Sequence, residues 1–458
     1  MKIKVPEPVE FIINTLMEYG YEAYAVGGCV RDTLLGRNPG DWDITTSAKP
    51  EEVKKLFRRT IDTGIEHGTV TIMLDKTGYE VTTYRVDGEY EDNRHPKSVA
   101  FTSDLIEDLK RRDFTINAMA YNEKDGIVDA FFGLQDLEKQ TIRSVGKAED
   151  RFDEDALRMM RAVRFAAQLG FVIEDKTKNA IRDKVSLLKN ISAERIRVEL
   201  VKLITSDHPE QLKVASELGI LDIVLPEFNE MLETEQQNPH HIYSVGDHTI
   251  ESIKALQQVI REKITSMVDS KMYTILCLTM LLHDSGKPKT RTVDTSGRDH
   301  FHGHPDISEK IAKKVLKRLK FDNYTIDMVC QLVKYHDNRY EVSAKAMRKA
   351  VSKVGLERMP YLFMVQRADI LAQNPSTWTD KLERIEKLER IYDEIVLRKD
   401  PVCLKDLEVG GKELMEEGFL PGKEMGQVLA RLLEHVLEIP EDNKKERLVA
   451  LAKQWKVQ

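Results

Sequence analysis

Residues 27–48 read GGCVRDTLLGRNPGDWDITTSA and are the most informative segment for the fold of the N-terminal part of the chain. Gly27 and Gly28 follow a strand-like run and precede a helical segment that starts near Val30. A turn without side chains lets a phosphate approach the backbone N–H groups at the start of a helix. A Gly-Gly turn is also typical of ordinary strand-to-helix connections, so its meaning depends on the residues that follow.

Two carboxylates come shortly after this turn. Asp41 and Asp43 lie in a run that predicts a strand over residues 41–46, and residues two apart on a strand project to the same face. Magnesium prefers one or two carboxylates together with substrate phosphates, and paired ions serve phosphoryl transfer. The pattern predicts a catalytic Mg²⁺ site at Asp41 and Asp43; the alternative is that both face solvent. Glu80, on another predicted strand, is a candidate third carboxylate.

Hydrophobic patterning divides the chain into an α+β part and an all-α part. Short β-branched and aromatic runs predict strands at 22–26, 41–46, 69–74 and 79–85. From Arg151 onward nearly every segment has helical periodicity. Turn-like residues interrupt the helical runs near Pro226, Pro239, Pro375 and Pro401. We therefore expect four domains, at residues 1–145, 146–238, 239–375 and 376–458.

The stretch 27–48 resembles the signature of the polymerase-beta-like tRNA nucleotidyltransferases, in the branch that also includes bacterial poly(A) polymerases. The similarity continues in RRDFTINAMAYN (111–122), DAFFGLQDL (129–137), EDALR (154–158) and SAERIRVELVKLI (192–204). The resemblance implies an α+β fold: a nucleotidyltransferase head domain, then a helical neck. It implies a Mg²⁺-dependent enzyme that adds C, C and A to the 3′ end of tRNA from CTP and ATP without a template, releasing pyrophosphate.

The same resemblance assigns roles to individual residues. Asp41 and Asp43 hold the metal ions. The nucleotide is contacted by Gly28, Arg31, Arg112, Asp155, Arg158, Arg161 and Arg164.

Base selection has a chemical rationale in the last four of these residues. Asp155, Arg158, Arg161 and Arg164 recur every three residues, which predicts one polar stripe on a single helix. Aspartate only accepts hydrogen bonds and arginine only donates them. The pair Asp155 and Arg158 therefore matches the amino donor and ring-nitrogen acceptor shared by cytosine and adenine, and mismatches uracil and guanine. The alternative is a solvated salt-bridge ladder.

Two features bear on whether the full CCA is added. Residues 85–96 resemble the flexible loop of enzymes that complete the terminal A, which favours full CCA addition. The alternative within the class is a poly(A) polymerase, but the basic motif which that group carries after the neck is not recognisable here.

A second set of chemistry-bearing residues lies in the all-α part. His283 and Asp284 end an apolar helix, and imidazole and carboxylate ligands from separate helices suit transition-metal ions such as Ni²⁺ or Mn²⁺. The pattern resembles an HD phosphohydrolase domain, with phosphodiesterase or phosphatase activity. The resemblance assigns as ligands His248, His283, Asp284, His304, His336 and Asp369. The alternative is a degenerate domain kept as a scaffold.

Two other classes of protein are alternatives to a polymerising enzyme. One is an HD phosphohydrolase whose N-terminal half recruits RNA, and the other is a non-catalytic RNA-binding protein. The presence of both Asp41 and Asp43 disfavours both.

Composition limits the partners. The net charge of −7 restricts RNA contact to local basic patches such as 110–112 and 444–447, since phosphate binding needs positive potential. Residues 406–436 resemble the helical region that embraces the tRNA elbow, with plain helical packing as the alternative.

Apolar runs are too short for a membrane span, residues 1–20 read as an amphipathic helix, and the four cysteines form no CxxC pair. We expect a cytoplasmic protein with reduced thiols; the sequence does not specify the oligomeric state or the hydrolase substrate.

Overall fold

The computed structural model describes residues 2–88, 99–237, 242–262 and 268–456. The chain divides into two compact units, residues 1–226 and 227–458. The division falls at Pro226, one of the predicted breaks. The predicted boundary at 238–239 and most of the predicted loop 85–96 lie outside the described residues.

The first unit is built on a mixed sheet. Within the described residues the sheet has seven strands in the order β3-β4-β5-β2-β1-β8-β9, with β2 parallel to β5 and every other neighbouring pair antiparallel. The strands are β1 (Ala23–Val26), β2 (Ile44–Thr46), β3 (Thr60–Gly64), β4 (Thr69–Leu74), β5 (Thr77–Thr83), β8 (Ala120–Asn122) and β9 (Gly126–Val128). The four predicted strands are confirmed as neighbours in one sheet. The strand expected from residue 41 begins only at Ile44, so Asp41 and Asp43 precede it.

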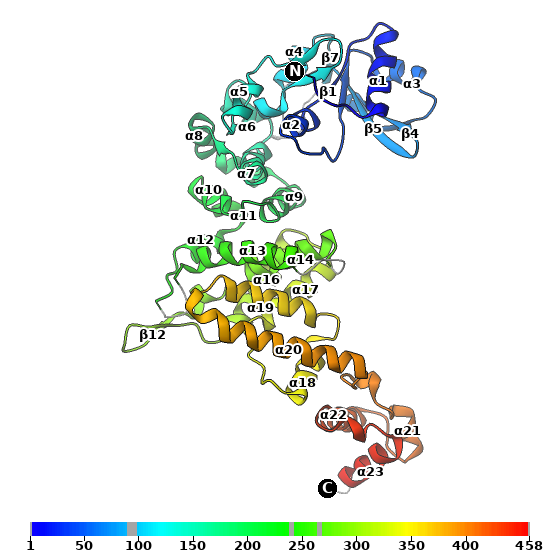
Figure 1. Ribbon diagram of the computed structural model, residues 1–458, viewed down its shortest axis with the longest axis vertical. Helices are drawn as coiled ribbons and strands as arrows, with labels where there is room; N and C mark the ends of the chain where they lie inside the picture. The colour runs from blue at the N-terminus through cyan, green and yellow to red at the C-terminus, as the bar shows by residue number, and fades with distance from the viewer. Residues whose placement is uncertain (1, 89–98, 238–241, 263–267, 457–458) are drawn as a thin grey trace. The chain divides into compact units, whose positions relative to one another are not determined.

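Helices cover the sheet because each carries an apolar stripe. In α1 (Glu7–Glu18), Val9, Ile12, Ile13 and Leu16 are buried, the i, i+3, i+4, i+7 spacing of one helix face. Helices α1 and α3 (Pro50–Leu56) lie side by side against the sheet (Figure 1). The other elements around it are α2 (Gly28–Leu34), β6 (Arg85–Asp87), β7 (Val99–Phe101), α4 (Leu105–Lys110) and α5 (Gly133–Glu138).

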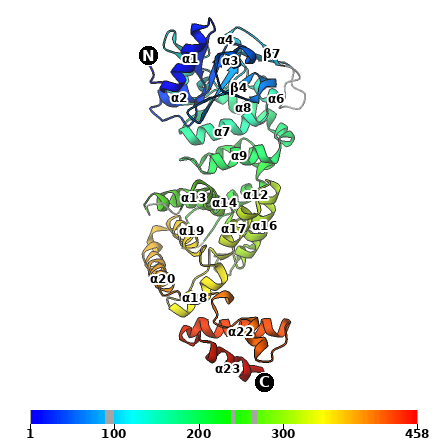
Figure 2. The ribbon, with the colours of Figure 1, turned by 90° about the vertical axis from the view of Figure 1, so that its right-hand side faces the viewer.

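The rest of the first unit is helical, with one short parallel strand pair. Its elements are β10 (Thr141–Ile142), α6 (Ala148–Glu154), α7 (Leu157–Leu169), β11 (Val172–Ile173), α8 (Asp175–Lys184), α9 (Ala193–Ile204), α10 (Gln211–Glu217) and α11 (Ile220–Val224). Helices α7 and α9 pack side by side (Figure 2).

The prediction that Asp155, Arg158, Arg161 and Arg164 form one polar stripe on a single helix is wrong for Asp155. Asp155 lies in the break between α6 and α7, with extended backbone (φ −140°, ψ 101°), and only the three arginines are on α7. The carboxylate of Asp155 accepts a hydrogen bond from the backbone N–H of Leu157 over 3.1 Å. Such a local side-chain-to-backbone bond competes with helix continuation.

The second unit is a helical layer around α14 (Ser270–Leu282), in which nine of the last eleven residues are buried. Its other elements are α12 (Pro226–Leu232), α13 (Val245–Glu262), α15 (Lys287–Thr290), β12 (Thr292–Val293), β13 (Asp299–His300), α16 (His304–Arg318), α17 (Asn323–Tyr335), α18 (Ala344–Val354), α19 (Met359–Leu371) and α20 (Trp378–Arg398). Helices α13, α17 and α19 pack against α14, which places the ends of several helices around one centre.

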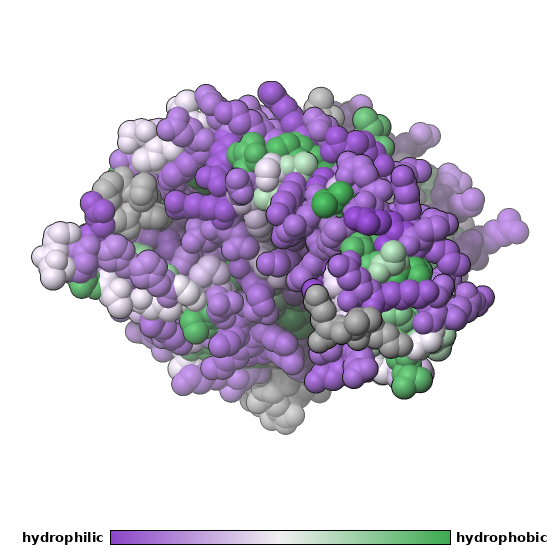
Figure 3. All heavy atoms as spheres, turned by 90° about the horizontal axis from the view of Figure 1, so that it is seen from below, coloured by the Kyte–Doolittle hydropathy of each residue, from purple (hydrophilic) through white to green (hydrophobic). Residues whose placement is uncertain are grey.

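The chain ends in three helices, α21 (Gly411–Glu416), α22 (Lys423–Glu438) and α23 (Lys445–Lys456). They share a small core of their own, formed by Val409, Leu414, Phe419, Met425, Leu432, Val436, Leu448, Val449, Leu451 and Ala452. The molecular face seen in Figure 3 is mostly hydrophilic, with hydrophobic side chains in small separate groups. Among the described helices, none combines the length and the apolar character that crossing a membrane requires. The four cysteines are free, as expected.

Candidate functional site

The Gly-Gly turn has a conformation that requires glycine. Gly27 has φ 82° and ψ −127°, and α2 starts at the next residue. A Cβ added to Gly27 would lie 3.0 Å from Nη1 of Arg112. The strand-to-helix turn predicted from the sequence is confirmed, and the missing side chain leaves room for the guanidinium of Arg112.

The carboxylates of Asp41, Asp43 and Glu80 lie near one another. In the parallel pair β2–β5, Ile44 is opposite Val81, which places Asp43 beside Glu80. The pKa of Asp43 is raised, first because its surroundings remove part of its hydration and then because Asp41 and Glu80 repel its negative charge; Arg112 opposes the shift. A cation at this position would relieve the repulsion, and carboxylate oxygens are ligands that Mg²⁺ prefers. The residues present therefore fit a magnesium ion.

Asp113 and Asn117 connect two of the predicted nucleotide-site arginines. Arg161 donates from Nε to Asp113 over 2.8 Å, and Asn117 donates to the other oxygen of Asp113 over 3.1 Å. Arg31 donates from Nη1 to Asn117 over 2.6 Å. Burial alone would raise the pKa of Asp113, but Arg161, Asn117 and Arg158 outweigh it and hold the pKa well below its usual range.

Sequence reasoning assigned no role to this linking pair. Both residues stand inside the motif 111–122 that carried the family resemblance. An aspartate and an amide four residues apart within this motif were the available signal.

Phe165 forms the apolar part of the arginine cluster. The guanidinium carbons of Arg31, Arg161 and Arg164 lie 5.0, 5.3 and 3.7 Å from the centre of its ring. Arg164 is only 6% exposed, and its Nε lies 2.8 Å from the carboxylate of Glu199. Burial lowers the pKa of Arg164 to about 10, against the opposing charge of Glu199. Arg164, one of the residues predicted to contact the nucleotide, is therefore packed inside the first unit.

Asp155 and Arg158 each have a different ionic partner. Arg158 binds Glu154 through Nη1 over 2.5 Å and donates from Nη2 to the backbone oxygen of Arg111 over 2.9 Å. Asp155 accepts a hydrogen bond from Nη2 of Arg195 over 2.7 Å. The structure thus places an acceptor just before α7 and a donor in its first turn, and each is held by a residue for which sequence reasoning assigned no function.

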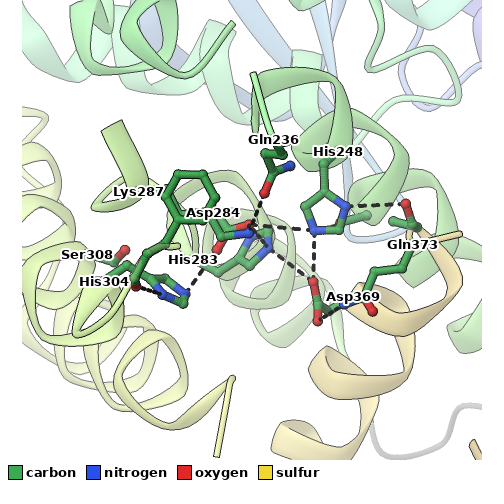
Figure 4. A network of polar contacts seen from close by, with 12 residues as sticks. Gln236, His248, His283, Asp284, Lys287, His304, Ser308, Asp369 and Gln373 are labelled. Carbon is green, nitrogen blue, oxygen red and sulfur yellow. Dashed lines mark hydrogen bonds and ion pairs between the residues drawn. The ribbon is translucent and has the colours of Figure 1, made fainter. Parts of the chain in front are cut away.

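In the second unit, all six residues predicted for the HD site come together. They form two groups, His248, His283, Asp284 and Asp369, and Asp284, His304 and His336, in which one ligand atom from each residue lies within 4.8 Å of the others. Asp284 belongs to both groups. Figure 4 shows it at the centre, with His304 on one side and His248 and Asp369 on the other.

The two carboxylate oxygens of Asp284 face different imidazoles. Oδ2 lies 3.2 Å from Nε2 of His283 and 3.6 Å from Nε2 of His248. Oδ1 lies 3.2 Å from Nε2 of His304 and 3.6 Å from Nε2 of His336. Asp284 would therefore offer one oxygen to each of the two groups of candidate ligands.

The backbone fixes the orientation of all four rings. Nδ1 of His283, His304 and His336 lies 2.7, 2.9 and 2.7 Å from the carbonyl oxygens of Met280, Phe301 and Val333, and Nδ1 of His248 lies 3.3 Å from Ala372 O. A proton held on Nδ1 by a carbonyl leaves the lone pair of Nε2 directed to the centre.

The centre is polar and buried, and its closest contacts are ionic. Among the described residues, His283 Nε2 and Asp284 Oδ2 have close ionic contacts but none with hydrogen-bond geometry. Lys287, which sequence reasoning missed, places Nζ 2.7 Å from Asp284 Oδ2. Burial by itself would lower the pKa of His283, but Asp284 and Asp369 raise it to about 10, so the two carboxylates favour a positive charge at Nε2, either a proton or a metal ion. An imidazole-rich set of this kind fits transition-metal ions.

The cluster opens into a cavity of about 370 Å³. Its walls carry Lys287, Arg298, Arg339 and Lys381 in addition to the ligand candidates. The cavity therefore offers cationic side chains next to a candidate metal centre.

Three regions of the chain match models of known protein families. Residues 23–143 match a family model of the poly(A) polymerase head domain. Residues 170–232 match the "Probable RNA and SrmB- binding site of polymerase A", and residues 301–452 match a model of tRNA nucleotidyltransferase domain 2.

Relatives match over part or nearly all of their length. The CCA-adding enzyme of Levilactobacillus brevis is 35% identical over 449 residues, 97% of this chain and 98% of that protein. The CCA-adding enzyme of Lactiplantibacillus plantarum is 56% identical over 219 residues, 47% of this chain and 53% of that protein. The crystal structure of the Bacillus stearothermophilus CCA-adding enzyme in complex with CTP superimposes with a TM-score of 0.72 at 30% identity, covering 99% of this chain and 98% of that one. These matches confirm the predicted α+β fold and the predicted activity, and the chain belongs to the family of CCA-adding enzymes, the tRNA nucleotidyltransferases.

Proposed function

We propose that CCA addition takes place at the convergence of Asp41, Asp43 and Arg112 on the turn at Gly27, with tRNA, CTP and ATP as substrates. The observation that carries this assignment is the carboxylate pair, whose mutual repulsion is balanced only in part by Arg112. The same turn offers backbone N–H groups at the start of α2 for the triphosphate.

The metal is Mg²⁺ in this proposal, held by Asp41 and Asp43, with Glu80 beside them. Bound there, Mg²⁺ supplies positive charge to the attacking 3′-hydroxyl and to the leaving pyrophosphate. The protein's own contribution is electrostatic: Arg112, beside the turn, and Arg31 and Arg161, held by Asn117 and Asp113, present fixed positive charge to the phosphates.

The base is read by Asp155 and Arg158 in this proposal. An acceptor-only and a donor-only side chain match the edges of cytosine and adenine and leave uracil and guanine with two mismatched contacts. The ion pairs with Arg195 and Glu154 hold both groups before a nucleotide arrives. Selection then needs no nucleic-acid template.

The test compares Asp43→Asn with Asp62→Asn, a matched change at an exposed aspartate that pairs with Lys54 in the same unit. The substrate is a tRNA transcript ending at the discriminator base, with CTP, ATP and Mg²⁺. We expect Asp43→Asn to lower the addition rate by at least about 100-fold, roughly 2.7 kcal/mol, with tRNA binding unchanged. Near wild-type addition by Asp43→Asn would overturn the metal assignment.

We also propose a second function, a metal-dependent phosphohydrolase at the HD centre. The observation that favours it is Asp284, which directs each oxygen to a separate group of imidazoles. With Ni²⁺ or Mn²⁺ as the ion, we expect hydrolysis of phosphoesters such as 2′,3′-cyclic nucleotides. Metal analysis of the purified protein, followed by phosphate-ester assays with each ion, tests this. A protein that binds no metal at these residues would support the scaffold alternative.

A further inference from the structure

Asp108, on α4, is a fully buried carboxylate in contact with two arginines and with the central sheet. Its exposed fraction is 0%. Arg111 donates to Oδ1 from Nε over 3.0 Å and from Nη2 over 2.8 Å. Thr45 of β2 donates to Oδ2 over 3.2 Å, and Nη2 of Arg112 lies 3.5 Å from the same oxygen. Each oxygen of Asp108 thus faces a different arginine.

The carboxyl group of Asp108 is ionised at neutral pH. Burial by itself would raise its pKa, but the charges of Arg111 and Arg112 and the hydrogen bonds from Arg111 and from the backbone N–H of Arg85 outweigh burial and lower the pKa. A buried charge is tolerated where it is paired and hydrogen-bonded. Removal of this one charge therefore takes a counter-ion away from both arginines.

The guanidinium of Arg112 is held in its position chiefly by charge. Its Nε is buried and has no hydrogen-bond partner among the described residues. Nη1 lies 3.0 Å from the position that a Cβ on Gly27 would take, and Nη2 faces Asp108. Asp43 and Asp113 attract the guanidinium less strongly than Asp108 does. The ion pair with Asp108 is therefore the contact that keeps Arg112 at the Gly27 turn.

Thr45 attaches Asp108 to the strand that follows the metal carboxylates. It pairs with Thr82 in the parallel pair β2–β5 and stands two residues after Asp43 in the chain. Asp43 and the counter-ion of Arg112 are thus located by the same strand. The cation and the carboxylates of the site keep their spacing through this connection.

We propose that Asp108 is a positioning residue for nucleotide addition. It holds the guanidinium of Arg112 at the Gly27 turn, where this cation meets the triphosphate, and keeps it from turning toward Asp43. Because it is fully buried, Asp108 itself does not contact the substrate. The inference rests on the proposed nucleotide site at Asp41, Asp43 and Arg112.

The first experiment separates KM from kcat. The full chain adds C to a tRNA transcript that ends at the discriminator base, and the CTP concentration is varied. In Asp108→Asn we expect KM for CTP to rise about tenfold, equivalent to about 1.4 kcal/mol, because Arg112 is no longer fixed. A smaller folded fraction would lower kcat and leave KM unchanged. Calorimetry with CTP in the absence of divalent metal should show the same loss of affinity.

The matched control is Asp104→Asn. Asp104 is the N-cap of the same helix and accepts a hydrogen bond from the backbone N–H of Ile106 over 2.8 Å. Asparagine caps a helix as well as aspartate does, so neither KM nor CTP affinity should change.

A double-mutant cycle tests whether Asp108 acts through Arg112. Arg112→Met alone should raise KM for CTP by at least about tenfold. Asp108→Asn added to Arg112→Met should raise KM by less than about twofold further, because the side chain that Asp108 positions is then absent. Thr45→Val is a milder change that keeps the charge and decides the question if Asp108→Asn does not fold. It should raise KM about threefold, and only where Arg112 is present.

The outcomes distinguish this inference from the proposed function. If Arg112→Met raises KM but Asp108→Asn and Thr45→Val do not, the positioning role is overturned and the nucleotide site stands. Effects of Asp108→Asn and Arg112→Met that multiply in the double variant overturn it as well. If Arg112→Met leaves KM unchanged, the proposed role of Arg112 fails and that of Asp108 fails with it.

Discussion

Arg195 donates a hydrogen bond from Nη2 to Oδ2 of Asp155 over 2.7 Å, although the two residues are 40 positions apart in the chain. Arg195 lies on α9 and Asp155 in the break before α7, and these two helices pack together. The packing of the neck thus sets the orientation of a carboxylate that we assign to base selection.

Removal of this support should reduce base selection without removing the catalytic carboxylates. In Arg195→Ala we expect UTP and GTP addition to rise about five- to tenfold relative to CTP and ATP, because a disoriented Asp155 loses about 1 kcal/mol of discrimination. Arg182→Ala, at an exposed arginine that donates a hydrogen bond to Asn179 over 2.9 Å, is the control. Single-nucleotide addition to one tRNA with each triphosphate measures the ratios.

Direct substitution of the selecting pair should have a larger effect. Asp155→Ala or Arg158→Ala removes one of two contacts and should lower discrimination by roughly 1 to 3 kcal/mol, or about five- to 150-fold. Addition should slow but persist because Asp41 and Asp43 are intact. If activity falls equally for all four triphosphates with base preference unchanged, these residues do not select the base.

Substitution of Gly27 should affect both stability and nucleotide binding. Gly27→Ala forces a side chain into φ 82° and places its Cβ 3.0 Å from Arg112 Nη1. We expect a loss of about 1 to 3 kcal/mol in the free energy of unfolding, and a higher KM for CTP because Arg112 is displaced. Gly40→Ala, whose added Cβ meets nothing within 4 Å, serves as the control. Thermal unfolding and the kinetics of nucleotide addition are measured for both variants. Equal stability and equal KM for CTP in Gly27→Ala and Gly40→Ala would contradict the prediction.

The Asp113 ion pair should make stability depend on pH in the acid range. Its folded pKa is lowered, so its stabilisation is fully present above the unfolded value of about 3.9 and is lost as pH falls toward the folded value. At neutral pH, Asp113→Asn should cost about 2 kcal/mol, roughly 4 to 8 °C in Tm. That Tm difference from wild type should shrink between pH 5 and pH 3. A difference that stays constant with pH, or an equal loss in Asp62→Asn, would refute this role.

The number of metal ions bound per chain should show whether Asp284 serves both groups of candidate ligands. His304→Ala changes only the second ligand group, so about one metal ion should remain, whereas Asp284→Asn changes both groups and should reduce the content of both ions. His300→Asn, at a histidine of the same cavity that belongs to neither group, should retain both. Elemental analysis after loading with Mn²⁺ gives the counts. Equal loss in His304→Ala and Asp284→Asn would rule out two separable positions.

Local chemistry in the sequence was enough to predict the turn at Gly27 and the four strands that the structure places in one sheet. Strand alternation did not apply to Asp41 and Asp43, because the strand begins only at Ile44; motif resemblance alone singled out these two carboxylates. Backbone freedom at glycine and motif resemblance each depend on a few consecutive residues. The six residues of the HD centre were also identified individually, because histidine and aspartate at helix ends are visible in the sequence.

Which of these groups meet, and in what geometry, depends on the packing of distant segments. The break at Asp155 follows from one hydrogen bond to Leu157 that competes with helix periodicity. The partners Asp113 with Arg161, and Asp155 with Arg195, come from segments about 40 to 50 residues apart, a separation over which no local pattern operates. The division of Asp284 between two imidazole groups likewise depends on the packing of α14, α16 and α17. The order of residues specifies which chemical groups are available, since each depends on a side chain and its near neighbours; the fold specifies their partners, because contacts between distant segments exist only once the helices and the sheet have packed.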